Sequence, residues 1–502
     1  MSDLFVQLTA PNGCTWMQPT GLFINNEWVK SSSGHKIASI NPANSEEIIS
    51  VYGATSEDVD KAVKAARAAL TDPAWRDLSG LDRGKLMSRL AKLIEDNRET
   101  LATIDTIDNG KPYTVALNED LTETAETIRY YSGFADKVFG QVIPTNADKF
   151  AYTVREPVGV CGQIIPWNYP LAMAAWKLGP ALACGNTVVL KPAEQTPLSA
   201  LFLANLIVEA GFPPGVVNIV NGYGSIAGAA LASHMDVDKI AFTGSTDTAR
   251  HIMKMASGNL KNITMETGGK SPLIVFNDAD LTEAVKWAHW GIMSNQGQVC
   301  TATSRILVQN DIYDQFLRAF EAQVKSVSKV GDPFDASTFQ GPQVTRAQYD
   351  RVMSYVRIGQ AEKATLLCGG KPVRDIGNGK GFYIEPTVFT DVSPEMRIYR
   401  EEIFGPVAVI ARFATDEEAI KMANDSTYGL GGAIFTTNLT RAHKVAGRVE
   451  AGTVWINFSN VGDWRVPFGG VKQSGIGREL GQAGLDEYTN IKAVHVNIQS
   501  KL

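Results

Sequence analysis

One cysteine of this sequence lies where a thiol could act as a nucleophile. Cys300 stands in the polar, glycine-containing segment 296–301, after a helical pattern over 281–293. A structural cysteine usually has apolar neighbours, whereas a loop of this kind lets a thiol meet a substrate. Because a cysteine taken alone is more often an inert core residue, the residues around it in the fold must decide its role.

Two other side chains have the chemistry that such a nucleophile requires. Glu266 ends an apolar run and begins a glycine turn, where a carboxylate could activate the water that clears an acyl group from the thiol. Asn168 lies between Pro166 and Pro170, and a rigidly held amide donor suits an oxyanion. The alternatives are an acid that caps a turn and an ordinary turn asparagine.

A glycine-rich segment is a candidate for binding a dinucleotide phosphate. Gly222, Gly224 and Gly228 follow a strand pattern and open a helical one, with the spacing G-x-G-x-x-x-G, one residue longer than the usual fingerprint. Backbone N–H groups at a glycine-lined helix N-terminus can approach a pyrophosphate, and a tight helix–sheet junction explains the same glycines without a ligand. Both interpretations stay open. A similar glycine spacing occurs at Gly475, Gly477 and Gly481. Because it follows no clear strand, we interpret these glycines as turn residues.

The elements that must position these residues alternate between strands and helices. The strand patterns cover 160–165, 187–191, 216–220, 239–242, 263–265 and 273–276. The helical patterns between them cover 171–183, 198–210, 225–233 and 246–256. This alternation predicts βαβ units and a parallel sheet covered on both faces, with ligands at the carboxyl ends of the strands.

The flanking parts of the chain complete this organisation. Short strand patterns cover 21–25 and 48–52, and long helical patterns follow to about residue 137, with Ser56 as the expected N-cap of a helix over 57–70. A second α/β stretch runs from 273 to about 477 without an obvious linker. A crevice between the two stretches is therefore the expected active site.

Composition narrows the class of protein. The chain has 502 residues, 44% of them hydrophobic, which is too long for a single core and predicts two or three domains. Lys and Arg total 47 against 53 Asp and Glu, a net charge of −6 with no long run of either sign. This balance offers nucleic acid no electrostatic footprint, so small molecules are the expected partners.

The cysteines and the two ends of the chain bear on the compartment. The five cysteines are odd in number and widely spaced, without a C-x-x-C pair or adjacent histidines, so neither a disulfide framework nor a metal site is expected. The start lacks a signal or transit pattern, and no run of about 18 apolar residues occurs, so we expect no membrane association. Ser500, Lys501 and Leu502 form a peroxisomal address, which predicts the import receptor as a partner; the cytoplasm is the alternative location.

Seven segments give the chain a resemblance to the aldehyde dehydrogenase superfamily over essentially its whole length. They are PWNYP (166–170), KPAEQTP (191–197), FTGST (242–246), METGGKSP (265–272), GQVCTATSR (297–305), EEIFGPV (401–407) and PFGGVKQSGIGRE (467–479). Seven segments in the right order are far more specific than any one of them.

The resemblance implies NAD-dependent, CoA-independent oxidation of an aldehyde to its acid. Cys300 would be the nucleophile, and the Asn168 amide with the Cys300 backbone N–H would hold the oxyanion. Glu266 would activate the water that releases the acid from a thioester, and Gly268 and Gly269 would give it room to swing. A relative that passes the acyl group to CoA commonly lacks this glutamate, and a scaffold protein that lost the chemistry would not need these residues together.

The resemblance also implies the cofactor contacts. Lys191 and Glu194 would bind the adenosine ribose, Glu402 the nicotinamide ribose, and Phe404 would lie beside the ring. Because a carboxylate accepts a hydrogen bond from the 2′-hydroxyl and repels a 2′-phosphate, Glu194 predicts NAD over NADP. The further implied cofactor-binding residues are Ile164, Pro166, Trp167, Gly224, Gly244, Ser245 and Gly268.

The fold implied by the resemblance is α/β with three parts. A Rossmann-like NAD-binding domain would cover 1–139 and 160–270, an α/β catalytic domain 271–480, and a small β oligomerisation flap with the tail 140–159 and 481–502. Similar enzymes are homodimers or homotetramers.

The substrate is the least determined feature. The residues that the resemblance places in the substrate pocket are Tyr169, Met173, Trp176, Ser294, Val299, Thr301, Phe458, Gly462, Trp464 and Phe468. Ser294 and Gly462 stand where many members of the family carry bulky aromatic residues, which indicates a substrate larger than acetaldehyde.

Three carboxylates could line the pocket entrance. Glu119 and Glu123 share a helix face at i and i+4, and Asp463 precedes Trp464, so acid and aromatic groups together favour an aminoaldehyde or a betaine-type aldehyde. The simplest interpretation of Glu119 and Glu123 is nevertheless a solvated helix face. Medium-chain aliphatic, aromatic and indolic aldehydes are the alternative substrates.

Overall fold

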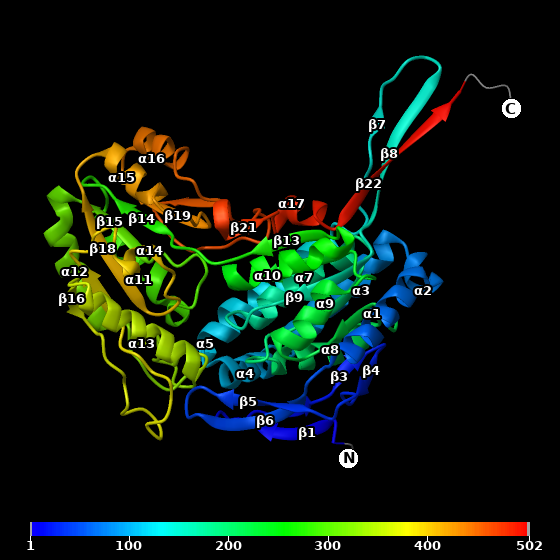
Figure 1. Cartoon of the computed structure of the whole chain (residues 1–502), viewed down its shortest axis with the longest axis horizontal. Coiled ribbons are helices and arrows are strands. Elements are labelled where there is room, and N and C mark those ends of the chain that lie inside the picture. The colour runs from blue at the N-terminus through cyan, green and yellow to red at the C-terminus, as the bar shows by residue number, and fades with distance from the viewer. Residues whose placement is uncertain (1–2, 499–502) are drawn as a thin grey trace.

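The computed structural model describes residues 3–498, folded as two lobes from which a narrow arm projects (Figure 1). Ser500, Lys501 and Leu502 lie outside the described residues, so the peroxisomal address stays a prediction. No helix within 3–498 combines the length and the apolar character needed to span a membrane.

The first lobe is built on an eight-stranded sheet whose central strands are parallel. In spatial order its strands are β21 (Gly475–Ile476), β13 (Asn262–Glu266), β12 (Lys239–Thr243), β9 (Val160–Ile164), β10 (Thr187–Lys191), β11 (Val217–Ile219), β3 (Leu22–Ile24) and β4 (Glu27–Val29). The predicted βαβ units are thereby confirmed. The strand β21 comes from the predicted segment 271–480 and pairs antiparallel with β13, so this segment returns to the first sheet before the chain leaves the lobe.

Two apolar cores cover the two faces of this sheet. One face packs against α1 (Ser56–Thr71), α9 (Ala229–Ser233) and α10 (Thr246–Ala256). The other packs against α3 (Gly80–Asp96), α4 (Arg98–Asn109), α6 (Leu121–Ser132), α7 (Pro170–Ala183) and α8 (Leu198–Ala210). The predicted N-cap at Ser56 is wrong by one residue, because Thr55 accepts the Asp58 N–H and the Asp58 carboxylate accepts the Thr55 N–H in a capping box.

The second lobe holds a seven-stranded sheet. Its strands in spatial order are β16 (Thr365–Cys368), β17 (Thr387–Thr390), β18 (Val407–Phe413), β15 (Arg305–Gln309), β14 (Pro272–Val275), β19 (Gly431–Phe435) and β20 (Thr453–Ile456). One face packs against α11 (Leu281–Met293) and α12 (Tyr313–Val327). The other packs against α13 (Arg346–Ala361), α14 (Arg397–Arg400), α15 (Asp416–Asn424) and α16 (Leu439–Ala446).

The arm is a three-stranded antiparallel sheet of β7 (Val142–Ile143), β8 (Lys149–Pro157) and β22 (Thr489–Asn497) (Figure 1). These strands fall within the segments 140–159 and 481–502 that were predicted to form the flap. Large apolar side chains stay exposed on it, among them Val142, Phe150 and Ile491.

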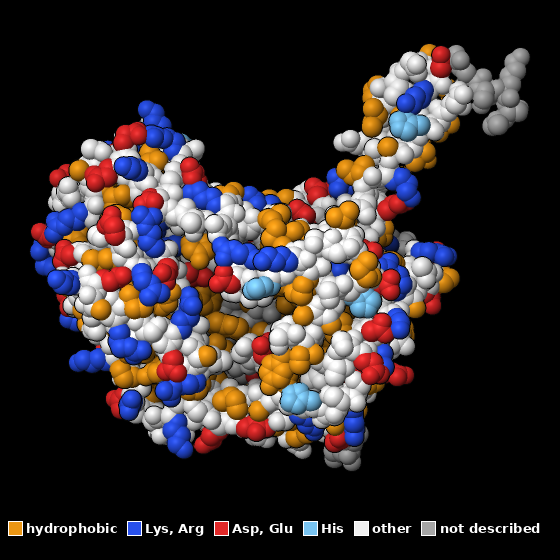
Figure 2. Space-filling model, viewed as in Figure 1, with side chains coloured by type: hydrophobic (Ala, Val, Ile, Leu, Met, Phe, Trp, Pro, Cys, Tyr) orange, Lys and Arg blue, Asp and Glu red, His pale blue; other side chains and the backbone are white. Residues whose placement is uncertain are grey.

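The remaining elements are short. They include β1 (Phe5–Thr9), β2 (Thr15–Pro19), β5 (Lys36–Asn41), β6 (Glu46–Tyr52), α2 (Pro73–Arg76), α5 (Tyr113–Val115), α17 (Gly481–Asp486), two π-helical turns, Ala116–Asp120 and Gly224–Gly228, and short 3-10 turns such as Ser294–Gly297. Figure 2 shows that this face of the molecule is hollowed between the two lobes.

Candidate active site

A large cavity opens between the lobes, with a volume of about 1200 Å³. Its walls come from the loop that follows β9, from the carboxyl ends of β12 and β13, from α6 and α7, and from the loops around Cys300, Glu402 and Asp463. All three predicted catalytic residues and all thirteen predicted pocket residues line it. The pocket residues are Glu119, Glu123, Tyr169, Met173, Trp176, Ser294, Val299, Thr301, Phe458, Gly462, Asp463, Trp464 and Phe468.

The loop that presents Cys300 has an unusual backbone. After α11 ends, Asn295, Gln296 and Gly297 all take positive φ angles of 46°, 58° and 70°, which turns the chain back toward the cavity. Such a conformation is costly for residues with side chains and is often found at functional sites. A Cβ on Gly269 would come within 2.5 Å of the Cys300 carbonyl oxygen, so glycine is required where the two loops touch.

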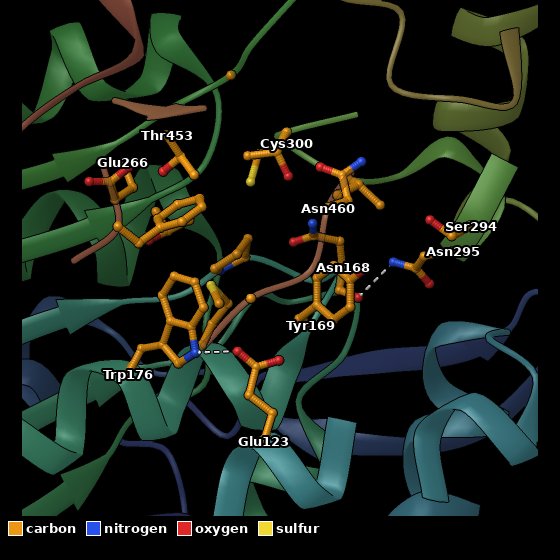
Figure 3. Close-up of a pocket in the computed structure, with 18 of the residues that line it drawn as sticks. Glu123, Asn168, Tyr169, Trp176, Glu266, Ser294, Asn295, Cys300, Thr453 and Asn460 are labelled. Atoms are coloured by element: carbon orange, nitrogen blue, oxygen red, sulfur yellow. Dashed lines mark hydrogen bonds between the residues drawn. The ribbon is translucent and has the colours of Figure 1, made fainter. Parts of the chain in front are cut away.

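Asn168 is fixed by the same loop. Its Nδ2 donates a hydrogen bond to the Gln298 carbonyl at 2.9 Å, and Asn295 Nδ2 donates to the Asn168 carbonyl at 3.2 Å. Asn168 and the Cys300 sulfur face the same cavity (Figure 3). An amide nitrogen has two donors, so one N–H of Asn168 stays available for a ligand.

The surroundings of Cys300 favour its neutral thiol form. Burial, then the carboxyl groups of Glu266 and Glu402, raise its pKa to about 12, and the backbone N–H groups of Thr301 and Cys300 oppose this rise. A thiol with so high a pKa needs a base before it can attack.

Glu266 is suited to act as that base. It ends β13 at the edge of the cavity, is 2% exposed, and neither of its carboxyl oxygens has a hydrogen-bond partner among the described residues. Burial, and then the charge of Glu479, raise its pKa well above the usual value. A carboxyl group of this kind is a stronger base than an ordinary glutamate.

Gly268 and Gly269 also make close contacts of their own, and their role in giving Glu266 room to swing stays a prediction. A Cβ on Gly268 would meet the Glu402 carboxyl group, and one on Gly269 would meet the Cys300 carbonyl. Two glycines face the Glu266 carboxyl group: a Cβ would lie 2.7 Å from Glu266 Oε1 on Gly469 and 3.5 Å from it on Gly475. The backbone at residues 268–269 is instead approached by the Glu402 side chain and by the loop that holds Cys300.

One wall of the cavity carries an acid and two aromatic rings. Glu402 accepts the Gly269 N–H at 2.9 Å, and burial raises its pKa to about 7. Trp167 and Phe404 stack edge to face with centroids 5.3 Å apart, and Phe404 has a left-handed backbone with φ of 63°. Of the predicted cofactor-binding residues, those that line this cavity are Pro166, Trp167, Gly244, Ser245, Gly268, Glu402 and Phe404.

The other predicted cofactor residues do not line this cavity and sit further along the carboxyl edge of the first sheet. Ile164 and Lys191 end the adjacent parallel strands β9 and β10, and Lys191 Nζ lies 3.3 Å from Glu194 Oε2. Gly224 begins the π-helical turn, and open space surrounds the position of its Cβ.

This edge fits a dinucleotide. The amino group of Lys191 and the half-buried carboxylate of Glu194 can bind ribose hydroxyls. Ser245 caps α10, an eleven-residue helix whose first N–H groups suit a phosphate. Glu402 and the two rings supply an acceptor and apolar walls at the far end.

The two carboxylates near the start of α6 lie at the cavity, as the pocket prediction has it. Glu119 and Glu123 both line the cavity, Glu123 half-buried and Glu119 exposed, and a π-helical turn over Ala116–Asp120 precedes α6 at this point. Trp176 Nε1 donates a hydrogen bond to Glu123 Oε1 at 2.9 Å (Figure 3). Burial raises the pKa of Glu123 to about 7 and that of Glu119 to about 6.

Asp463 differs from these two acids. Arg465 binds both of its oxygens, with distances of 2.8 and 2.6 Å, and the hydrogen bonds hold the Asp463 pKa below its usual value. Although Asp463 lines the cavity as predicted, its charge is already neutralised. Glu119 and Glu123 have no basic side chain within ion-pair distance in the part of the chain that the structure describes.

The cavity is wide where the sequence predicted room. A Cβ on Gly462 would meet no atom within 4 Å. Ser294 stands at the end of α11 with a small side chain. The opposite wall is aromatic, with Trp176 and Phe468 packed edge to face at 5.0 Å.

Several lining residues were missed from the sequence. The clearest is a buried pair behind Glu266, in which Lys177 Nζ lies 2.6 Å from Glu479 Oε1 and donates to Thr243 Oγ1. The single lysine in the otherwise apolar helix 171–183 could have identified this pair, because a buried lysine needs a partner. Others, such as Asn295, Gln348, Arg351 and Asn460, come together only through tertiary folding. Within residues 3–498 no cluster of His, Cys, Asp and Glu could hold a metal ion.

Comparison with known proteins agrees with this geometry. The aldehyde dehydrogenase family matches residues 28–494. An aldehyde dehydrogenase of Alternaria alternata is 53% identical over 494 residues, which is 98% of this chain and 98% of that protein.

Solved structures of aldehyde dehydrogenases have the same fold. The NAD+ complex of the Bacillus cereus enzyme superimposes with a TM-score of 0.94, at 49% identity over 96% of this chain and 97% of that one. A betaine aldehyde dehydrogenase from Staphylococcus aureus also has a TM-score of 0.94, at 42% identity over 97% of this chain and 96% of that one. An indole-3-acetaldehyde dehydrogenase from P. syringae has the same TM-score, at 43% identity over 96% of this chain and 97% of that one. The chain belongs to the aldehyde dehydrogenase family.

Proposed function

We propose that this aldehyde dehydrogenase oxidises a positively charged aldehyde to its acid with NAD, through a thioester on Cys300. The observation that carries the chemistry is the meeting of Cys300, Asn168 and Glu266 on one cavity. Family membership supports aldehyde oxidation, and the NAD+ complex of the Bacillus cereus relative supports the cofactor.

The dinucleotide would lie along the carboxyl edge of the first sheet. Lys191 and Glu194 would hold one ribose, the N-terminus of α10 at Ser245 the phosphates, and Glu402 the other ribose. When bound, NAD supplies a hydride acceptor. The acidic Glu194 favours NAD over NADP, because a carboxylate repels a 2′-phosphate.

The first step forms a bond between Cys300 and the aldehyde carbon. Glu266 takes the thiol proton, directly or through a water, and the sulfur attacks the carbonyl. The carbonyl oxygen becomes negative and is held by the free N–H of Asn168 and the backbone N–H of Cys300. Loss of the hydride from this adduct restores the carbonyl and leaves a thioester.

The second step breaks the thioester. After Glu266 has passed the thiol proton to solvent, it removes a proton from water and the hydroxide attacks the acyl carbon. The carbon–sulfur bond then breaks, which releases the acid and leaves Cys300 as a thiolate that regains a proton. Because Glu266 is present and unpartnered in this cavity, water rather than CoA is the acyl acceptor in this proposal.

Two unpaired carboxylates support the positively charged substrate. Glu119 and Glu123 line a cavity that also has aromatic walls, and neither has a basic partner among the described residues. An ammonium group bound there would be attracted by both charges and would lower the pKa of each acid.

The test is NADH formation with a set of propanals that differ only in the group on C3: an ammonium, a trimethylammonium or a methyl group. We expect kcat/KM to be higher for 3-aminopropanal and 3-(trimethylammonio)propanal than for butanal. Cys300→Ala should abolish turnover of all three while the protein stays folded by circular dichroism. A higher kcat/KM for butanal than for the two cations would rule out a preference for a positively charged substrate. Turnover by Cys300→Ala would rule out the thioester mechanism.

A second candidate substrate is a large neutral aldehyde, aliphatic, aromatic or indolic. The apolar side chains Phe458, Val461 and Val466 are exposed at the cavity wall, and Gly462 leaves space beside them. The betaine aldehyde and indole-3-acetaldehyde enzymes are equally similar to this chain, so the comparison favours neither class.

We also propose a homodimer or homotetramer assembled through the arm. Its exposed apolar residues include Val142, Phe150 and Ile491, and a second copy of the chain would cover them. Sedimentation analysis of the wild type and of Ile491→Glu tests this, with a smaller species expected for the variant.

We further propose a peroxisomal location. It is tested by imaging a fluorescent N-terminal fusion with and without Ser500, Lys501 and Leu502.

A further inference from the structure

A hydrogen bond from Trp176 orients the carboxylate of Glu123, which an ammonium group could bind. Trp176 Nε1 donates to Glu123 Oε1 at 2.9 Å, and no described group donates to Glu123 Oε2. Figure 3 shows this carboxylate pointing into the cavity that Cys300 faces. Glu123 therefore offers one oriented oxygen acceptor to the substrate.

One aromatic ring beside Glu123 already binds a cation. Lys111 Nζ lies over the Tyr169 ring, 4.3 Å from its centroid, and also pairs with the buried Asp120. Trp176 packs edge to face against Phe468. A ring that already binds one cation is a poor surface for a second, since the two positive charges repel through it.

The free carboxylate oxygen and the occupied ring favour a primary ammonium group over a quaternary one. A quaternary ammonium has no N–H and depends on aromatic faces, whereas a primary ammonium has three donors and forms short charge-assisted hydrogen bonds with carboxylates. The site has free carboxylate oxygens on Glu123 and Glu119, while a face of Tyr169 is occupied.

We propose that the site selects aldehydes whose ammonium group bears N–H bonds, and that Glu123, oriented by Trp176, is the residue that determines this selectivity. The inference rests on the proposed function and makes it narrower. Glu123 accepts the ammonium N–H through Oε2, while Trp176 keeps Oε1 in place. Glu119 adds negative charge to the same wall of the cavity.

The experiment compares kcat/KM for 3-aminopropanal and for 3-(trimethylammonio)propanal, with butanal as the uncharged reference. In the wild type we expect the primary ammonium to be favoured over the quaternary one by at least about tenfold, the size of one charge-assisted hydrogen bond. Glu123→Gln should reduce this ratio to near one. Trp176→Phe keeps a ring but loses the N–H, and should lower the ratio by raising KM for 3-aminopropanal with little change in kcat.

A matched control is available one turn along the same helix. Glu126 pairs with Arg129 and does not line the cavity, so Glu126→Gln should keep the wild-type ratio. A wild-type ratio of one or below, or a ratio unaffected by Glu123→Gln, would overturn the inference. A preference for butanal over both cations would instead overturn the charged substrate of the proposed function.

Discussion

Lys177 Nζ lies 2.6 Å from Glu479 Oε1 behind the catalytic cavity, and neither side chain is more than 4% exposed. The pair acts on Glu266 with opposite signs, because Glu479 raises the Glu266 pKa and Lys177 lowers it. The pKa of Glu266 therefore depends on the relative influence of Glu479 and Lys177. Neither residue was identified from the sequence.

Removing the negative charge of the pair should shift the catalytic base. In Glu479→Gln the charge of Lys177 is no longer opposed, so the Glu266 pKa falls. The acid limb of the pH profile for hydrolysis of p-nitrophenyl acetate, which needs no cofactor, should move to lower pH. Because breaking a buried ion pair costs about 3–5 kcal/mol of stability, the thermal midpoint should fall as well.

The double variant Lys177→Met, Glu479→Gln is the control for that loss of stability. It leaves no buried charge unpaired, and it should recover much of the thermal midpoint while the acid limb lies between those of the wild type and Glu479→Gln. An acid limb that stays in place in both variants would show that the pair has no influence on Glu266.

Glu266→Gln should separate the two halves of the reaction. An amide cannot remove a proton from water, so hydrolysis of the thioester should slow by about 10²–10⁴-fold. Formation of the thioester should slow less, because hydroxide in solution can also take the thiol proton, so mass spectrometry of the quenched enzyme should find the acyl group on Cys300. Steady-state turnover close to that of the wild type would show that another group activates the water.

Much of the fold could be predicted because periodicity and turn residues are local. The helices 198–210, 246–256 and 281–293 begin and end where the patterns predicted, and the strand 187–191 does as well. The N-cap at Ser56 missed by one residue because Thr55 and Ser56 are both good caps, and only the capping box with Asp58 decides between them.

The site was predictable where motif residues lie in short segments and less so where tertiary contacts decide. Glu123 was expected on a solvated face because a helix pattern shows which residues share a face and not what that face meets. Asp463 was expected to carry a free charge, but Arg465 two residues later neutralises it. Gly469 and Gly475, some two hundred residues away in the chain, face Glu266 as well, and nothing local in the sequence connects them with it.

The acids of the cavity should make the preference for a cation depend on pH. Burial raises the Glu123 pKa to about 7, and the charge of Asp120 adds to this rise while Lys111 opposes it. A carboxyl group gains its charge as pH rises through its pKa. We therefore expect kcat/KM for 3-aminopropanal, divided by that for butanal, to rise between about pH 6 and pH 8.

Dividing by the value for butanal removes the titration of Glu266 and Cys300, which both substrates share. The other groups that face Glu123 are Glu119, whose pKa is raised to about 6, and Tyr169, which stays neutral. In Glu123→Gln the rise near pH 7 should disappear and a smaller one near pH 6 should remain. A ratio that is constant from pH 6 to pH 8 in the wild type would contradict a recognition role for these acids.

The width of the cavity should be set by a residue without a side chain. A Cβ on Gly462 would have no atom within 4 Å, and its backbone is not in the left-handed region, so Gly462→Phe should fold normally with an unchanged thermal midpoint. The ring would occupy the space between Trp464 and the opposite wall. Differences of this kind in an apolar pocket are worth about 1–3 kcal/mol, so kcat/KM for phenylacetaldehyde should fall by about 10–200-fold. Because acetaldehyde needs only the space next to Cys300, its kcat/KM should stay within about twofold, and an equal loss for both aldehydes would mean that the ring disturbs the nucleophile and not the width of the cavity.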